Sequence, residues 1–159
     1  MILPVTPQLQ EDSVWCWAAV ASMVSNYYAQ RGAGNALSQC AVASLTLARS
    51  CCPSPPPPVI CHYQQNLQKA LLLSSHLNNV NQPSSAFGVV AGEVDGGRPL
   101  CAAYQYTNGA LHYLLITGYD APTLQIALID PMTGVLSHGP YGGFLNNNSG
   151  SWAGWIFTR

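Results

Sequence analysis

The chain has 159 residues, of which 48% are hydrophobic and only 7% are charged, and its formal net charge is −1. This length suits one domain, or two lobes around a shared core, and is too short for a TIM barrel. The five basic residues are scattered, so the basic surface that nucleic-acid binding requires is missing. No apolar run approaches the roughly 18 residues that a membrane span needs.

The first predicted element is an extended lead-in over residues 1–10. It has no basic patch followed by an apolar stretch, so it does not resemble a signal peptide. We expect a leader to be absent or already removed. Asp12 or Ser13 can cap a helix over residues 14–30, whose inward positions at helical spacing are Trp17, Val20, Ala21 and Val24.

Three further helices are expected before the sheet, over residues 37–49, 63–77 and 84–94. Four of the six cysteines fall within residues 40–61, next to a proline-rich run at residues 53–58. From residue 98 onward the hydrophobic period changes to two, which predicts strands over residues 100–106, 111–119, 124–130 and 155–158. Helices followed by an antiparallel sheet indicate an α+β fold. We expect a single domain over residues 1–159, with a helical lobe at about 12–95 and a sheet lobe at about 98–159.

The cysteine cluster comprises Cys40, Cys51, Cys52 and Cys61. A loop-rich segment of this kind has little core of its own and favours disulfides. Adjacent cysteines rarely bond to each other, so Cys51 and Cys52 should each pair with one of the other two, in an order that the sequence leaves open. Zinc bound by these thiols and His62, without the usual C-x-x-C pairs, and free thiols are the alternatives. Disulfides would place the protein in an oxidising compartment: secreted, or delivered to a periplasm or host cell.

Cys16 is the candidate nucleophile. It lies in the first turn of the strongest predicted helix, where unpaired N–H groups and the helix dipole favour a thiolate. The competing interpretation is a buried structural cysteine between Trp15 and Trp17. Among the four histidines, His112 is the candidate base, because it opens an apolar strand.

Asp130 is the candidate orienting group, because it ends the strand that follows the strand of His112. The two strands form a hairpin, and a connecting loop with an odd number of residues would place both side chains on one face. An even loop would place them on opposite faces unless a bulge intervened. Asp130 also begins an Asp-Pro-x-x-Gly turn, and it can serve in both roles. Gln10 could donate to an oxyanion, but spacing alone favours an exposed glutamine, with Gln8 as a rival.

These residues resemble a known family. The pattern Gln10-x5-Cys16-Trp17-Ala18-Ala19, then His112-Tyr113, then Asp130-Pro131 is similar to that of papain-like cysteine peptidases, above all a small bacterial group with secreted, avirulence-type effector proteases. Cys51-Cys52, Cys61 and Gly97-Arg98-Pro99 also look similar to bacterial members. The Cys-Gly-Ser-Cys-Trp core of plant papains is missing, and the chain is short, so a minimal substrate cleft is expected.

The resemblance implies a central helix headed by Cys16 and packed on the sheet, a catalytic triad of Cys16, His112 and Asp130, and Gln10 as oxyanion donor. The implied activity is peptide-bond hydrolysis without metal or cofactor, by a secreted effector or toxin. Its partners would be a protein or peptide substrate and an inhibitor or immunity protein. The alternatives are another thiol acyl-transfer enzyme (cell-wall amidase, glutamine deamidase or transglutaminase), a binding module that has lost the chemistry, and a structural domain held by disulfides.

Overall fold

The computed structural model describes residues 1–52, 56–79 and 84–159, so residues 53–55 of the proline-rich run lie outside the described part. The described helices are α1 (Cys16–Ala29), α2 (Gln39–Leu47), the 3-10 turn η1 (Val59–Cys61), α3 (Leu67–Leu73), α4 (Phe87–Asp95) and α5 (Tyr141–Leu145). The described strands are β1 (Leu77–Asn79), β2 (Leu100–Tyr106), β3 (Leu111–Asp120), β4 (Gln125–Asp130), β5 (Val135–Pro140), β6 (Asn146–Asn147) and β7 (Gly150–Thr158).

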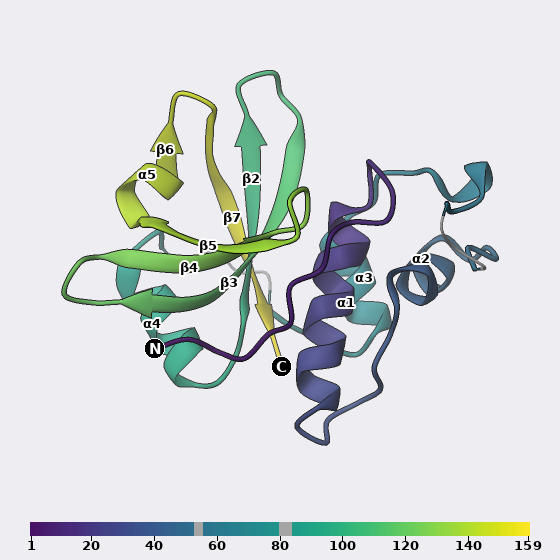
Figure 1. Ribbon diagram of the computed structural model, residues 1–159, viewed down its shortest axis with the longest axis horizontal. Helices are drawn as coiled ribbons and strands as arrows, with labels where there is room; N and C mark the ends of the chain where they lie inside the picture. The colour runs from purple at the N-terminus through teal and green to yellow at the C-terminus, as the bar shows by residue number, and fades with distance from the viewer. Residues whose placement is uncertain (53–55, 80–83) are drawn as a thin grey trace.

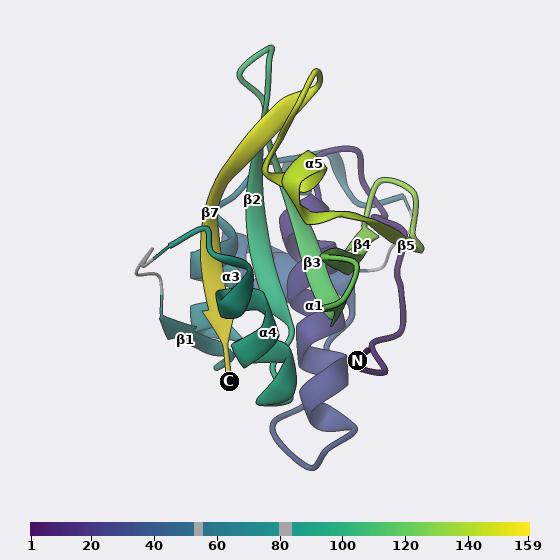
Figure 2. The ribbon, with the colours of Figure 1, turned by 90° about the vertical axis from the view of Figure 1, so that its left-hand side faces the viewer.

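The fold is α+β, as the sequence predicts. Helices α1, α2 and α3 pack on one another to one side of an antiparallel sheet (Figure 1). The strand order in the sheet is β1-β7-β2-β3-β4-β5, and β6 pairs with β7. Helix α4 packs against β3 and β2, and Figure 2 shows the long β7 and β2 beside β3, with α1 behind them.

Helix α1 is the centre of the structure, although its start differs from the prediction. It begins at Cys16 rather than residue 14, and neither Asp12 nor Ser13 caps it; instead Asp12 Oδ1 accepts a hydrogen bond from the Val14 amide at 2.9 Å. All of its residues except Asn26 and Ala29 are buried. A helix that is buried on all sides is typical of a core element, so the position of Cys16 is fixed by packing rather than by a surface cap.

The third predicted helix is shorter than expected. The side chain of Asn66 accepts a hydrogen bond from the Gln68 amide and starts α3 at Leu67. The helix ends at Leu73, and Ser75 has a φ of 66°, in the left-handed region that a continuing helix does not use. Local capping therefore overrides the longer hydrophobic pattern.

Sequence patterns do not predict β1, β5, β6 or α5, and they predict β7 only from residue 155. Strand β5 is the outer strand of the sheet and is mostly exposed, so it shows no apolar alternation. The first half of β7 contains Gly150 and Gly154, and glycine depresses strand propensity. The segments β1, β5, β6 and the first half of β7 form strands because a neighbouring strand pairs with them.

The lead-in, residues 2–10, lies along the β3–β4 hairpin before it reaches α1. At one end the Leu3 amide donates to the Thr117 carbonyl at 2.7 Å. At the other end the Gln10 amide donates to the Pro131 carbonyl at 2.8 Å. Gly134 lets the chain approach closely here, because a Cβ atom on it would lie 2.9 Å from the Leu9 backbone nitrogen. The segment that leads to Cys16 is thus attached to the strands that carry His112 and Asp130.

Candidate active site

Cys16 is the first residue of α1 and carries a free, buried thiol that is 5% exposed. The residue before it, Trp15, makes no side-chain cap. The first N–H groups of a helix have no intrahelical partner, and the helix dipole adds partial positive charge at this end. The sulfur therefore lies where negative charge is stabilised.

His112 and Asp130 meet in the fold. His112 Nε2 lies 2.8 Å from Asp130 Oδ1, and the histidine side chain is almost completely buried. Asp130 Oδ1 also accepts a hydrogen bond from the Met132 amide at 2.8 Å, within the turn that Asp130 begins. Because Nε2 is engaged with the carboxylate, Nδ1 is the ring nitrogen that remains for Cys16.

Electrostatics link all three groups. Burial lowers the pKa of His112, but hydrogen bonds with Asp130 and Cys16 and the charges of both groups outweigh it and raise the pKa to about 9. Burial raises the pKa of Asp130, yet its hydrogen bonds with His112 and the Met132 amide more than offset this, so the net pKa is lowered. At neutral pH the imidazole is therefore held in its protonated form between a carboxylate and the sulfur.

A β-bulge brings His112 and Asp130 to the same face. The β3–β4 connection, residues 121–124, follows the pair Asp120↔Gln125 and is therefore even, which would place the two side chains on opposite faces. The register shifts between Ile116↔Leu128 and Gly118↔Ala127, so Thr117 is the extra residue. The bulge restores the alignment that the sequence left undecided.

Close packing fixes the bulge. Gly118 forms an isolated bridge with Ile2, and a Cβ atom on it would lie 2.6 Å from the Met1 carbonyl oxygen, so a larger residue does not fit. Thr117 is buried, and its hydroxyl has no hydrogen-bond partner in the described part of the chain. The bulge is thus held by the lead-in from one side and by β4 from the other.

Gln10 lies beside the start of α1, but its amide is engaged. Its Nε2 donates to the carbonyls of Asp12 and Ser13 at 2.9 and 2.8 Å. Its Oε1 is buried and has no hydrogen-bond partner among the described residues. Gln8, the rival, lies beside a later turn of α1, where its side-chain oxygen Oε1 accepts a hydrogen bond from the Ser22 hydroxyl. Of the two, Gln10 is the one near Cys16.

A sequence comparison now decides the family. A family model described as papain-like cysteine protease AvrRpt2 matches residues 2–148. This chain belongs to that family of cysteine proteases. The match spans the lead-in, Cys16, His112 and Asp130, and a search of curated proteins finds no significant match.

The cysteine cluster of the protease forms two disulfides, Cys40–Cys52 and Cys51–Cys61. This agrees with the expectation that each adjacent cysteine pairs with one of the outer two, and the four thiols are not zinc ligands. The second disulfide holds the segment that is hydrogen-bonded to the tryptophans on either side of Cys16. Trp15 Nε1 donates to the Cys61 carbonyl at 2.8 Å, and Trp17 Nε1 donates to the Tyr63 carbonyl at 3.1 Å.

The remaining histidines lie elsewhere in the protease. His62 Nδ1 lies 2.9 Å from Asp12 Oδ2 at the surface and ties the disulfide segment to the loop before α1. His76 is buried: it stacks on Tyr28, and its Nδ1 lies 3.0 Å from the Arg159 carbonyl oxygen. Cys101, the other free thiol, is fully buried, and burial raises its pKa, so it is a poor nucleophile.

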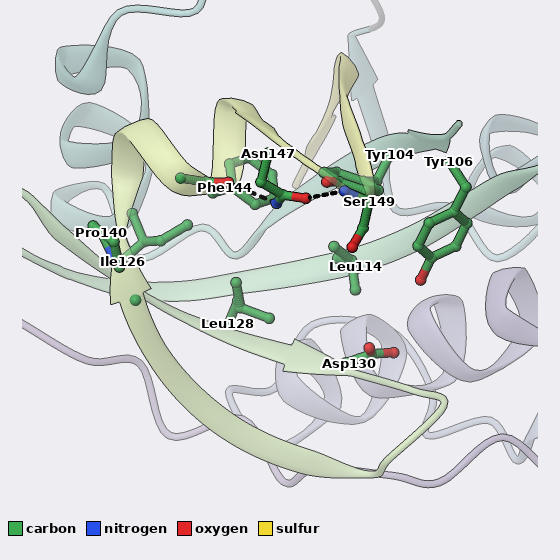
Figure 3. A pocket seen from close by; sticks show the side chains of 12 residues that line it. Tyr104, Tyr106, Leu114, Ile126, Leu128, Asp130, Pro140, Phe144, Asn147 and Ser149 are labelled. Atoms are coloured by element: carbon green, nitrogen blue, oxygen red, sulfur yellow. Dashed lines mark hydrogen bonds between the residues drawn. The ribbon is translucent and has the colours of Figure 1, made fainter. Parts of the chain in front are cut away.

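The aromatic residues of β2 that lie beside His112 and Asp130 were not predicted from the sequence. The ring of Tyr106 stacks on His112 with centroids 5.9 Å apart, and Tyr106 and Asp130 border a pocket of about 420 Å³. We call this the Asp130 pocket; Figure 3 shows its lining, which includes Tyr104, Tyr106, Leu114, Leu128, Asp130 and Phe144. The alternation of aromatic residues in 100–106 is the signal that could have revealed it.

In residues 1–52, 56–79 and 84–159, no three histidine, cysteine or acidic side chains gather as a metal site would require. In the same ranges, no helix has both the length and the apolar character of a membrane span.

Proposed function

We propose that this cysteine protease hydrolyses peptide bonds through a triad in which Cys16 is the nucleophile, His112 the general base and acid, and Asp130 the orienting group. The observation that carries this proposal is the arrangement around His112. One ring nitrogen lies 2.8 Å from the partly buried Asp130 carboxylate, and Cys16, a free thiol at a helix start, acts on the same ring and raises its pKa. Nucleophile, base and orienter in contact are the signature of covalent acyl transfer.

The mechanism follows from these positions. The Cys16 sulfur attacks the substrate carbonyl carbon, and the C=O electrons move onto the oxygen. His112, protonated at neutral pH, gives its proton to the leaving amine as the C–N bond breaks. Water then attacks the acyl-enzyme, with His112 taking one of its protons, and releases the acid. Asp130 holds the ring in register throughout.

The oxyanion that forms during attack needs hydrogen-bond donors. The Cys16 N–H lies at the open start of α1, where such donors are available. Gln10 is the second candidate; for this role its amide must turn away from the Asp12 and Ser13 carbonyls, to which it donates in the free protein. One such donor typically contributes about 3 kcal/mol to transition-state stabilisation.

A hollow lies between the start of α3 and the sheet, on the face of β3 opposite to His112. Leu111 and Tyr113, which flank His112 on β3, face Asn66 and Gln68 near the start of α3 across a space of about 320 Å³. We call it the α3 hollow.

We also propose that the protease works outside a reducing cytosol, as a secreted or delivered effector. The two disulfides support this, because such bonds persist in oxidising compartments. An inhibitor or immunity protein that protects the producing cell would be a natural partner of such an enzyme.

The deciding experiment compares the wild-type protein with Cys16→Ala on a mixture of intact proteins. We expect new peptide termini with the wild type and none with Cys16→Ala, while the thermal unfolding temperature stays nearly unchanged because only one sulfur atom is removed. Mass spectrometry separates the rival thiol chemistries: glutamine deamidation or cross-linking without cleavage would replace protease by deamidase or transglutaminase. Equal cleavage by both proteins would refute the proposed triad.

A further inference from the structure

The backbone around Gln10 is held by both parts of the protein. Leu9 and Glu11, its neighbours in the chain, are each hydrogen-bonded to the side chain of Gln39, the first residue of α2. The backbone amide of Gln10 itself donates to the Pro131 carbonyl, just beyond β4, at 2.8 Å. This alternation is typical of an extended chain, and it fixes residue 10 between the helical part and the sheet.

The side-chain amide of Gln39 matches the backbone groups that it contacts. Its Oε1 accepts a hydrogen bond from the Glu11 amide at 2.9 Å, and its Nε2 donates to the Leu9 carbonyl at 2.8 Å. The same Nε2 donates to Gln8 Oε1 at 3.3 Å. Because a carboxamide carries both an acceptor and donors, one side chain supplies the N–H of Glu11 and the C=O of Leu9 with the partners that they need.

Burial shows that Gln39 does more than fill space. Its side chain lies in the interior, only 2% exposed, and a buried amide costs free energy unless its atoms are hydrogen-bonded. Glutamine is mostly a surface residue, and the neighbouring buried positions of α2 are taken by Val42 and Ala43. Ser38 caps the helix by accepting a hydrogen bond from the Ala41 amide, so the position of Gln39 is set by the start of α2.

The backbone of Gln10 determines where its side-chain amide can reach. In the free protein this amide donates to the carbonyls of Asp12 and Ser13, and its Oε1 is buried with no hydrogen-bond partner among the described residues. To stabilise an oxyanion formed at Cys16, the side chain must rotate while the backbone stays in place. A displacement of about 1 Å in such a group can cost about 10²-fold in rate, so the support of this backbone matters for catalysis.

We propose that Gln39 is a positioning residue for the oxyanion donor: it holds the backbone on both sides of Gln10, so that the Gln10 amide can reach the oxyanion formed at Cys16. Gln39 acts on the reaction only through Gln10. This inference deepens the proposed function and rests on it, because the oxyanion exists only if Cys16 attacks a carbonyl group.

A double-mutant cycle in kcat tests whether Gln39 acts through Gln10. Gln10→Ala should lower kcat about 10²-fold, the scale of losing one oxyanion donor. Gln39→Met has a similar length and no amide, and should lower kcat about tenfold, because a displaced donor keeps part of its effect. The double variant should have the kcat of Gln10→Ala alone. An unchanged kcat in folded Gln10→Ala, or losses that multiply in the double variant, would overturn the inference.

A second readout separates the oxyanion donor from the nucleophile. A peptide aldehyde adds to the Cys16 sulfur and forms a tetrahedral adduct whose oxygen takes the oxyanion position. Alkylation by iodoacetamide forms an S–C bond and releases iodide, with no oxyanion. Gln39→Met should therefore weaken inhibition by the aldehyde about tenfold and leave the alkylation rate of Cys16 at the wild-type value. An equal fall in the alkylation rate would assign the effect to the nucleophile and overturn the inference.

Thr46→Ala is the matched control, because Thr46 is another buried polar residue of α2, and its hydroxyl donates to the Val42 carbonyl within the helix. It should lower the thermal unfolding temperature, as Gln39→Met does, without changing kcat or aldehyde inhibition. Gln39→Asn is the milder variant: its amide is one methylene shorter and cannot reach both backbone groups. It should show the pattern of Gln39→Met at smaller size, which keeps the test decisive if Gln39→Met does not fold.

The failure of this inference is distinguishable from the failure of the proposed function. Peptide cleavage that is equal in the wild type and Cys16→Ala, or absent from both, would refute the proposed function and this inference with it. Cleavage that depends on Cys16 and is unaffected by Gln39→Met and Gln39→Asn, when both are folded, would overturn this inference alone.

Discussion

The helical part and the sheet part of this protease position the residues of the proposed triad by different means. Cys16 is positioned by a buried helix whose flanking tryptophans are bonded to a disulfide-held segment. His112 and Asp130 are positioned by strand register, which a single bulge residue, Thr117, corrects. The position of Cys16, the proposed nucleophile, therefore depends on core packing and a disulfide, whereas the pairing of His112 with Asp130 depends on the strand register of the β3–β4 hairpin.

Deleting Thr117 should have the largest effect on the sheet side. Without the bulge, the even loop places His112 and Asp130 on opposite faces, so we expect at least a loss of about 10³-fold in kcat, the scale of losing a triad contact. NMR titration should show the His112 pKa falling from about 9 toward its ordinary value.

Thr117→Val is the control for that deletion. It keeps the bulge and removes a buried hydroxyl that has no partner among the described residues, so activity should persist and stability should not fall. A deletion variant that is folded and fully active would show that register does not position the pair.

Asp130→Ala tests the orienting group separately from the register. We expect kcat to fall by about 10²- to 10⁴-fold, less than in Cys16→Ala, because an orienter acts through the base. Asp130→Asn retains an acceptor oxygen for the His112 N–H and should be less impaired. Equal losses in folded Asp130→Ala and Cys16→Ala would assign Asp130 a more direct role.

The helical part is tested by opening each disulfide in turn. The two bonds close loops of similar length, with separations of 12 and 10 residues, so replacing either pair by serine should cost a similar free energy of unfolding, about 2–4 kcal/mol. Only the Cys51→Ser/Cys61→Ser variant releases the segment whose carbonyl groups accept hydrogen bonds from Trp15 and Trp17.

We therefore expect a lower kcat for Cys51→Ser/Cys61→Ser than for the matched Cys40→Ser/Cys52→Ser variant at a temperature where both are folded. Urea unfolding and steady-state kinetics measure the two quantities separately. Equal kcat values would mean that packing of α1 alone fixes the nucleophile.

The smallest expected effect is that of pH between 5 and 8. The pKa of His112 is raised to about 9, so the stabilising contribution of its protonated form is complete below the ordinary value of 6.5 and is lost as the pH rises through about 9. The pKa of Asp130 is lowered, so its contribution is present above its ordinary value of 3.8 and is lost as the pH falls through the depressed value.

Activity should therefore be nearly flat over this range, whereas stability should begin to fall above about pH 6.5, and both should decline as the pH rises through about 9. A pH series of kcat/KM and of the unfolding temperature checks this. A fall in activity centred near pH 6.5 on raising the pH would show that His112 keeps its ordinary pKa.

The sequence was sufficient for much of the fold and site, for identifiable reasons. Helical spacing in α1, period-two strands and the cysteine pattern are local signals, and they predicted the α+β class, a helix that contains Cys16 and the disulfide-bonded cysteines. The pairing of His112 with Asp130 depended on loop parity and on a bulge. A bulge leaves no local mark, because Thr117 suits a strand equally well with or without it.

Other features were beyond local patterns. The edge strand β5 forms because it pairs with β4. Helix α3 is shorter than expected because Asn66 caps its start, which the spacing of hydrophobic residues does not indicate. The Asp130 pocket is assembled from β2, β4 and the α5 region, which are separated along the chain. Such sites depend on tertiary contacts rather than on spacing.

The lead-in has a mechanical consequence. Residues 2–10 are hydrogen-bonded at the Thr117 bulge and again at Pro131, next to Asp130, and the chain then continues directly into the loop before Cys16. This one segment thus connects the hairpin that carries His112 and Asp130 to the loop that precedes Cys16. Cleavage or displacement of this segment would release both the β3–β4 hairpin and the loop before Cys16. Activity would then be lost through a change that contacts none of the reacting atoms.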